Sequence, residues 1–183
     1  MDVDLVARAR SGDEDAFASL AVAIVDRCYA LAFRILRDPE LAHDATQRAL
    51  LGVWRDLPTL SNTARFAAWL DRSVVHACYS EARQERRWQV RVKLAVVRPA
   101  STPDFATSIV DRDELEHAFK SLTPEQRAVV VLHHFHGYSL GEVAEVLEIP
   151  VGTARSRMHY AMRRLREAII GDARPMTPTE WTG

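Results

Sequence analysis

The sequence is poor in the residues that mark several large protein classes. Only 7 glycines and 8 prolines occur among 183 residues, too few for an all-β chain rich in turns. The two cysteines, Cys28 and Cys78, supply neither a disulfide framework nor a paired metal-ligand spacing. Both stand in segments with helical apolar spacing, so we expect small core residues in a reducing compartment.

A long uncharged apolar run is also missing. No segment reaches the roughly 18 residues that indicate a membrane-spanning helix, and the start MDVDLVARARSGDED lacks the pattern of a secretory signal. We therefore expect no membrane insertion and a cytoplasmic location. Neither a glycine-rich phosphate loop nor a nucleophile elbow occurs, so the sequence favours no enzyme class and indicates no cofactor.

The charges nearly cancel over the whole chain but are separated along it. The 24 Lys and Arg residues oppose 25 Asp and Glu residues, which gives a formal net charge of −1. Residues 83–98 and 155–166 are strongly basic, whereas residues 111–148 carry an acidic excess. A phosphate backbone responds to local basic stripes, so this composition is compatible with nucleic-acid binding.

Apolar residues recur at three- and four-residue spacings through the first half, which predicts three helices. The first starts near Ser11, where Glu14 completes a capping-box pattern. The second covers about 39–56 and the third about 64–86, whose far end is basic. The apolar faces of the first two helices consist of Phe17, Leu20, Ile24, Cys28, Leu31 and Ile35 and of Leu50, Val53, Trp54 and Leu57. On the third helix we expect Phe66, Trp69, Leu70, Val74 and Ala77 to face inward.

A composition change divides the chain. Residues 99–104 are rich in Pro, Ser and Thr, which is typical of a linker. We therefore expect an all-α protein of two small helical domains, residues 1–87 and 113–170. A flexible linker, residues 88–112, joins them, and a tail, residues 171–183, follows.

The second half carries the pattern of a helix-turn-helix. Capping boxes at Thr123 and Ser139 start two helices, and the turn Glu148-Ile149-Pro150 precedes a last helix with a basic outer face. The major groove of DNA admits one such helix, whose first turns reach base edges. An Arg-rich face alone is often only solvated, but the capped helix and the turn favour DNA binding. The candidate base-reading residues are Thr153, Arg155, Ser156, Arg157 and His159, and Arg163 and Arg164 are candidates for phosphate contacts.

The order of these features resembles that of a bacterial sigma factor of the extracytoplasmic-function (ECF) group. The segment LTPEQRAVVVLHHFHGYSLGEVAEVLEIPVGTARSRMHYAMRRLREAI is similar to the fourth conserved region of that family. In the first half, DAFASL, AHDATQRALLGVW and FAAWLDRSV resemble its second conserved region. Many helix-turn-helix proteins would match the second half alone, so the joint match in this order supports the identification.

The resemblance implies a transcription initiation factor that binds core RNA polymerase and promoter DNA, with an anti-sigma factor as a further partner. The last helix would read the minus-thirty-five element, while the loop at 61–65 and the third helix would open the minus-ten element around a flipped base. The implied polymerase-binding residues are Asp44, Gln47, Arg48, Leu51 and Trp54. The implied minus-ten residues are Asn62, Thr63, Arg65, Arg72, His76 and Arg83.

Two positions depart from the pattern of that family. Arg48 stands where the docking motif usually has an acid, and Glu148 stands where the turn usually has Gly. A left-handed backbone at Glu148 would cost about 1 kcal/mol.

Arg48 leaves a second interpretation open: a sigma-like DNA-binding regulator without productive polymerase docking. A protein-interaction adaptor is a third, and the basic last helix argues against it.

Other residues have two interpretations each. Trp69 is either a core residue or part of the base pocket. The basic end of the third helix, Arg83 to Arg91, either contacts nucleic acid or only solvates a helix end. His133, His134 and His136 lack a known zinc spacing, so we expect no metal site there.

Overall fold

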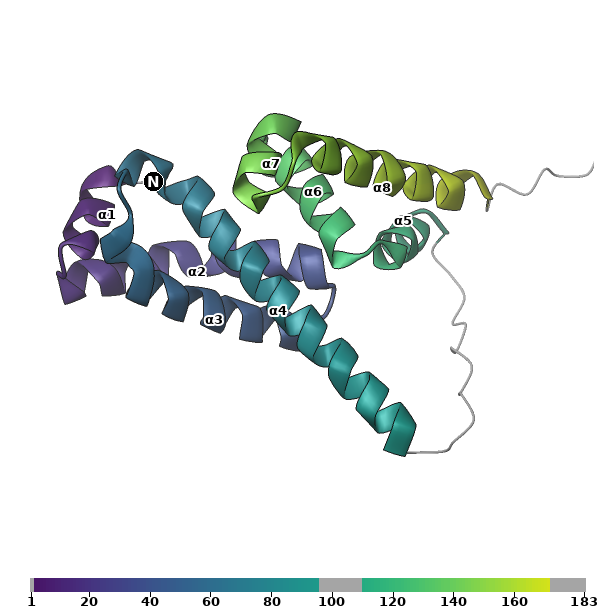
Figure 1. Ribbon diagram of the computed structural model, residues 1–183, viewed down its shortest axis with the longest axis horizontal. Helices are drawn as coiled ribbons and strands as arrows, with labels where there is room; N and C mark the ends of the chain where they lie inside the picture. The colour runs from purple at the N-terminus through teal and green to yellow at the C-terminus, as the bar shows by residue number, and fades with distance from the viewer. Residues whose placement is uncertain (1, 96–109, 172–183) are drawn as a thin grey trace, which may run out of the picture.

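The computed structural model describes residues 2–95 and 110–171, and within these ranges every regular element is a helix (Figure 1). The all-α prediction is confirmed. Most of the predicted linker and nearly all of the predicted tail lie outside the described residues. The first unit contains α1 (Val3–Arg10), α2 (Glu14–Leu36), α3 (Pro39–Asp56), the 3-10 turns η1 (Leu57–Thr59) and η2 (Thr63–Arg65), and α4 (Phe66–Ala95). The second unit contains α5 (Val110–Ser121), α6 (Pro124–His134), α7 (Leu140–Leu147) and α8 (Val151–Gly171).

The start of the chain differs from the prediction. A separate short helix, α1, precedes α2, and the N-cap of α2 is Asp13, whose carboxylate accepts a hydrogen bond from the backbone N–H of Ala16 at 2.9 Å. Ser11 closes α1 instead, and its hydroxyl donates to the carbonyl of Ala7 at 3.0 Å. The predicted capping box at Ser11 is wrong because Gly12, at φ 94°, turns the chain between two helices.

α4 is longer than the sequence pattern predicts. It continues to Ala95, into the range 88–112 predicted as linker. The segment has no glycine or proline before Pro99, and Gln, Arg and Lys are good helix formers even without an apolar face. The Gln89 amide also donates to Glu85 one turn earlier, at 2.8 Å. The division of the chain into domains at residues 87 and 113 stays a prediction.

α2 is the central helix of the first unit. Its residues Leu20, Ile24 and Leu31 are fully buried. α2 packs against α1, α3 and α4 (Figure 1). By length and composition alone, α2 is also the one described helix that is apolar enough to cross a membrane. Its apolar face lies in the core, which accounts for that hydropathy.

Most of the apolar positions predicted on α3 and α4 are in the core. Val53, Phe66 and Leu70 are buried. Trp54 differs from them, because half of its surface is exposed while its ring meets Phe17 edge to face, with 4.5 Å between ring centroids. The apolar face predicted for α3 is therefore only partly a core face.

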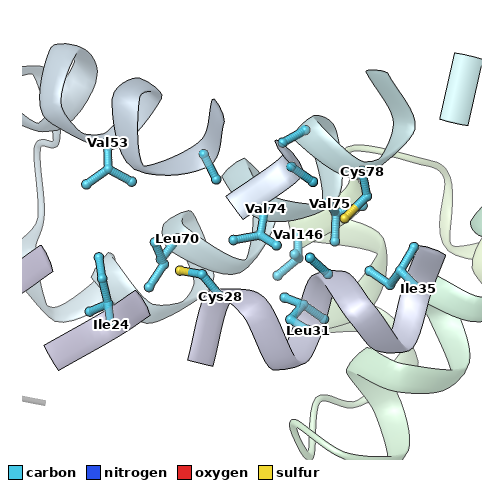
Figure 2. Packing of buried hydrophobic residues seen from close by; sticks show 14 of the residues in the cluster. Ile24, Cys28, Leu31, Ile35, Val53, Leu70, Val74, Val75, Cys78 and Val146 are labelled. Carbon is cyan, nitrogen blue, oxygen red and sulfur yellow. The ribbon is translucent and has the colours of Figure 1, made fainter. Parts of the chain in front are cut away.

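The two units pack against each other. α6 lies against α2 and α4, and α7 lies against α4 (Figure 1). Val146 of α7 lies among Leu31, Val74 and Val75 of the first unit (Figure 2). A continuous apolar core thus passes from one unit into the other.

The second unit starts its helices as the sequence predicts. The hydroxyl of Thr123 accepts from the backbone N–H of Gln126, whose side chain accepts from the N–H of Thr123. Ser139 and Glu142 form the same reciprocal pair at the start of α7. These two capping boxes fix where α6 and α7 begin, and α8 then packs across α5, α6 and α7.

The two cysteine thiols should be protected in the folded chain. Cys28 and Cys78 are free and buried, and burial raises the pKa of Cys28 to about 12 and that of Cys78 still higher. Because the thiolate is the reactive form, we expect the native protein to react with a disulfide reagent about 100-fold more slowly than the unfolded chain. The measurement is release of thionitrobenzoate at pH 8 with and without guanidinium chloride. Rapid labelling of either thiol in the native protein would contradict this burial.

Candidate nucleic-acid interface

The turn between α7 and α8 is built on a strained residue. Glu148 has φ 52° and ψ 46°, the left-handed conformation, and its backbone N–H donates to the carbonyl of Glu145 at 3.2 Å. This is the left-handed backbone at which Glu in place of Gly carries a conformational cost. Its cost of about 1 kcal/mol is offset by the tight turn, which lets α8 begin at Val151 and cross α7.

The first turns of α8 present a polar face to solvent. Ala154 and Ala161 are fully buried, so small side chains hold the opposite face of the helix close to α5, α6 and α7. Arg155, Ser156 and His159 are exposed, whereas Thr153 and Arg157 are half-buried at the margin of this face.

The predicted phosphate-contacting arginines lie further along α8. Arg163 is exposed, 3.5 Å from Glu167 and stacked over the ring of Tyr160. Arg164 is also exposed and donates to the carbonyl of Ser121 at 3.3 Å. Exposed contacts of this kind contribute little, so both guanidinium groups stay available for another anion.

The residues assigned to the minus-ten element lie on η2 and α4. Asn62 caps η2 by accepting from the backbone N–H of Ala64 at 2.9 Å. Thr63 and Arg65 follow on η2 itself. The spacing of the other three puts them on one face of α4, namely Arg72, His76 and Arg83.

His76 belongs to a basic environment. Its ring reaches solvent, yet desolvation and then the charges of Arg72 and Arg83 lower its pKa, against the opposing charge of Glu148. The imidazole is therefore neutral at pH 7 and can both donate and accept a hydrogen bond.

A cleft of about 550 Å³ separates this surface from the second unit. Trp69 lines the cleft and is also half-buried against Phe66, with 5.9 Å between ring centroids, so it takes part in both the core and the cleft. The other polar lining residues are Ser61, Asn62, Arg65 and Arg72 from the first unit and Tyr138, Glu142 and Glu145 from the second.

Two of the minus-ten arginines are paired with acids of the helix-turn-helix. Arg65 lies 3.2 Å from the carboxylate of Glu145, and Arg72 lies 2.6 Å from that of Glu148. No sequence pattern indicates these contacts, because the partners are more than 70 residues apart.

A cluster of four polar side chains around one buried carboxylate, the Asp71 cluster, joins the units next to this cleft. Oδ2 of Asp71 accepts from the guanidinium of Arg27 at 2.7 Å, from the hydroxyl of Tyr138 at 2.8 Å and from Nδ1 of His136 at 2.9 Å. Only 1% of Asp71 is exposed, so its charge depends on these donors. Nδ1 of His136 also lies 3.1 Å from Arg27, but it carries a proton toward the carboxylate and cannot accept there.

The pKa of Asp71 reflects two opposing effects. Burial alone would raise the pKa of this carboxyl, but the hydrogen bonds and charges of His136 and Arg27 outweigh burial and hold it below its usual range. Burial and the neighbouring carboxylate raise the pKa of Tyr138, which keeps its hydroxyl protonated and donating.

Two of the three neighbouring histidines contribute to the fold, and the third, His134, is exposed. Nδ1 of His133 lies 2.7 Å from the carbonyl of Tyr138, and His136 belongs to the Asp71 cluster. Within residues 2–95 and 110–171, no group of three or more His, Cys, Asp or Glu side chains is placed to hold a metal ion.

The residues assigned to polymerase binding share an exposed face of α3, the docking face, which consists of Asp44, Gln47, Arg48, Leu51 and Trp54. Leu51 is 70% exposed and Trp54 is 50% exposed. Two large apolar side chains one turn apart on a solvent face are typical of a surface that binds another protein.

Arg48 does not add a free positive charge to the docking face. Its Nε lies 2.6 Å from a carboxylate oxygen of Glu81, and its Nη1 donates to the hydroxyl of Ser80 at 3.3 Å. Glu81 is buried on α4, so the departure from the family pattern at Arg48 has an acidic partner within the fold. Sequence reasoning missed Glu81 because the two residues lie on different helices.

Comparison with known proteins identifies the family. The family described as Sigma-70 region 2 matches residues 20–88, and that described as Sigma-70, region 4 matches residues 118–167. The ECF RNA polymerase sigma factor SigL of Mycobacterium tuberculosis is 34% identical over 163 residues, covering 85% of this chain and 92% of that protein. The chain belongs to the ECF sigma factors. SigK of Mycobacterium bovis is 32% identical to this sigma factor over 177 residues, which cover 92% and 94% of the two chains.

Solved structures of sigma factors share the fold. RpoE from Bartonella quintana, in complex with the anti-sigma factor NepR, superimposes with a TM-score of 0.65 at 23% identity and covers 85% of this chain and 98% of that one. CnrH, in complex with the cytosolic domain of CnrY, gives a TM-score of 0.63 at 23% identity and covers 94% and 99%. The predictions of a sigma factor and a helix-turn-helix are thus confirmed, and the family comprises DNA-binding transcription initiation factors rather than enzymes.

The Asp71 cluster should make stability depend on pH in one direction. The folded-state pKa of Asp71 is lowered, so its contribution is complete above the unfolded-state pKa of about 3.9 and is lost as the pH falls through the folded-state value. We expect Asp71→Asn to cost about 3 kcal/mol at pH 7 and less as the pH falls toward 3. Urea unfolding along a pH series measures both values. Asp26→Asn, an exposed acid on α2, is the control and should change little; a cost for Asp71→Asn that is the same at every pH would contradict the assignment.

Proposed function

We propose that this sigma factor binds core RNA polymerase and directs it to promoters by reading the minus-thirty-five element with α8 and opening the minus-ten element at η2 and α4. The observation that carries the proposal is the first half of α8, whose small buried residues hold one face while Arg155, Ser156 and His159 face solvent. The polymerase performs the chemistry, and this chain supplies recognition.

Recognition of the minus-thirty-five element follows from the chemistry of α8. Arg155 can donate two hydrogen bonds to N7 and O6 of a guanine, while Ser156 can bond to several bases. Thr153, Arg157 and His159 flank them, and Arg163 and Arg164 lie where the helix leaves the groove and meets phosphates.

Opening of the minus-ten element needs a pocket for an extruded base and a basic track for the single strand. Trp69 offers a ring on which a base can stack, and the neutral His76 can pair with a base edge. Asn62 and Thr63 would contact the base from η2. Arg65, Arg72 and Arg83 would hold the strand backbone.

The docking face of α3 would bind the polymerase through its apolar pair, Leu51 and Trp54. Asp44 and Gln47 would add polar contacts around that pair. The ion pair between Arg48 and Glu81 weakens the alternative in which Arg48 prevents docking.

We also propose an anti-sigma partner. RpoE was solved in complex with the anti-sigma factor NepR, and CnrH in complex with the cytosolic domain of CnrY. These roles place the chain with the polymerase in the cytoplasm.

The first test is co-purification of the full chain with core RNA polymerase, followed by transcription from genomic fragments. We expect a stable complex and promoter-specific transcripts. Leu51→Arg should lower the amount of complex at least 10-fold without unfolding the chain, since Leu51 is exposed and docking residues of this kind contribute about 2 kcal/mol or more. Val22→Arg, an equally exposed apolar position on α2, is the matched control. A folded wild-type chain that forms no complex would refute the proposal.

Two arginines of α8 should separate base reading from phosphate contact. Arg155→Ala should weaken promoter binding by about 1–3 kcal/mol and relax the sequence preference at one position. Arg166→Ala, an exposed residue further along the helix, should weaken binding to all sequences alike and reduce the salt dependence by about one ion. Fluorescence anisotropy with a promoter duplex and its single-base variants, over a salt series, measures both. Equal effects of the two variants would remove Arg155 from the base-reading set.

A further inference from the structure

We infer that Glu81, a buried residue of α4, is a positioning residue of the docking face: its ion pair with Arg48 leaves Asp44 free to bind a cationic group of the polymerase. The inference rests on the proposed function and assigns a further residue to that surface. It accounts for a base at position 48, where the docking motif usually has an acid.

Asp44 and Arg48 are exposed residues one turn apart on α3. An acid four residues before a base is the favourable order for an ion pair along a helix. Such a pair would offset the charge of Asp44 and would compete with any cation that a partner offers. The structure does not contain it: Arg48 pairs with another acid, and within residues 2–95 and 110–171 Asp44 is in no ion pair.

The guanidinium of Arg48 turns toward α4 instead. Its Nε lies 2.6 Å from Oε1 of Glu81, and its Nη1 donates to the hydroxyl of Ser80 at 3.3 Å. Both contacts come from neighbouring residues of α4, the helix that packs along α3. They hold the side chain of Arg48 between the two helices, so it is not available to Asp44.

The choice between the two acids strongly favours Glu81. Only 5% of the Glu81 side chain is exposed, and among the described residues Oε1 accepts no hydrogen bond of good geometry, so the charge of Arg48 is what offsets it. Separating this pair would leave a buried charge without compensation. A pair between Arg48 and Asp44 would contribute little in exchange, because water solvates both of these exposed groups.

The ion pair leaves the docking face with one net charge. The opposite charges of Arg48 and Glu81 largely cancel at the distance of a bound partner, whereas Asp44 keeps its own. Leu51 lies on the same face, two turns beyond Asp44, and is exposed. A complementary surface therefore combines an apolar patch with a Lys or Arg side chain that faces Asp44.

The experiment measures the dissociation constant of the full chain from immobilised core RNA polymerase by biolayer interferometry. Asp44→Asn removes the acid, and Glu81→Gln releases Arg48. Two double variants, Glu81→Gln/Asp44→Asn and Glu81→Gln/Arg48→Gln, then remove either the acid or the released base. Glu85→Gln makes the same chemical change one turn further along α4 and is the matched control. Circular dichroism and thermal unfolding check the fold of each variant.

We expect Asp44→Asn and Glu81→Gln each to weaken binding about threefold or more, because the first removes the acid and the second lets Arg48 offset it. Replacement of Arg48 in the Glu81→Gln chain should restore most of the lost affinity. Asp44→Asn should cost almost nothing further in the Glu81→Gln chain, and the control should bind as the wild type does.

A purely structural role of Glu81 gives a different pattern. Asp44→Asn would then weaken binding by the same factor with and without Glu81, and Arg48→Gln would restore nothing. Either result overturns the inference. Because Asp44 is exposed, its replacement should not unfold the chain, so an unchanged affinity of Asp44→Asn overturns the inference whatever Glu81→Gln does to the fold.

The same measurement separates this inference from the proposed function. A folded wild type that forms no complex with the polymerase refutes the proposed function and the inference with it. A wild type that binds, beside a folded Glu81→Gln chain that binds equally tightly, refutes the inference alone.

Discussion

The buried carboxylate of Asp71 is the contact on which the arrangement of the two units depends. One oxygen of this carboxylate accepts hydrogen bonds from a residue of α2 and from two residues between α6 and α7. A shift of any of these elements would leave the buried charge without a hydrogen-bond donor. Gly137, at φ 74°, makes this possible, because the turn that it allows brings His136 and Tyr138 to the same oxygen. Burial of the charge thus defines one relative position of three elements.

The position of α7 and α8 follows from that arrangement. Ser139 caps α7 directly after Tyr138, and Glu148 turns the chain into α8, so the last helix is placed by a short covalent path from the Asp71 cluster. The faces left to solvent include the outer side of α8 and the docking face of α3. Both carry side chains that the packing of the units does not use.

Short sequence motifs correctly predicted the features that depend only on residues close together in the chain. The capping boxes at Thr123 and Ser139 were predicted correctly because the cap and its partner are only three residues apart in the sequence. The family motifs identified the fold and its order, and the residues assigned to α3 do share one face. The apolar pattern alone could not show that Val53 of α3 is buried while Trp54 is half exposed, because a helical apolar stripe looks the same whether it meets the core or another protein.

The contacts between distant segments had no signal in the sequence. Glu81 forms an ion pair with Arg48 from another helix, and Asp71 accepts a hydrogen bond from His136, 65 residues away in the sequence. No spacing rule connects either pair. The pairing of Arg65 with Glu145 of α7 and of Arg72 with Glu148 in the following turn is of the same kind. Such pairs depend on how helices cross, which is decided by the packing of the whole core rather than by any window of the chain.

The length of α4 has a consequence for the reach of the molecule. The helix has 30 residues, so it is a rod of about 45 Å, and its far end stands away from the other helices (Figure 1). The helix thus carries the start of the connection to α5 well away from the core of the first unit, so the point at which the second unit is attached stands at the end of a rod.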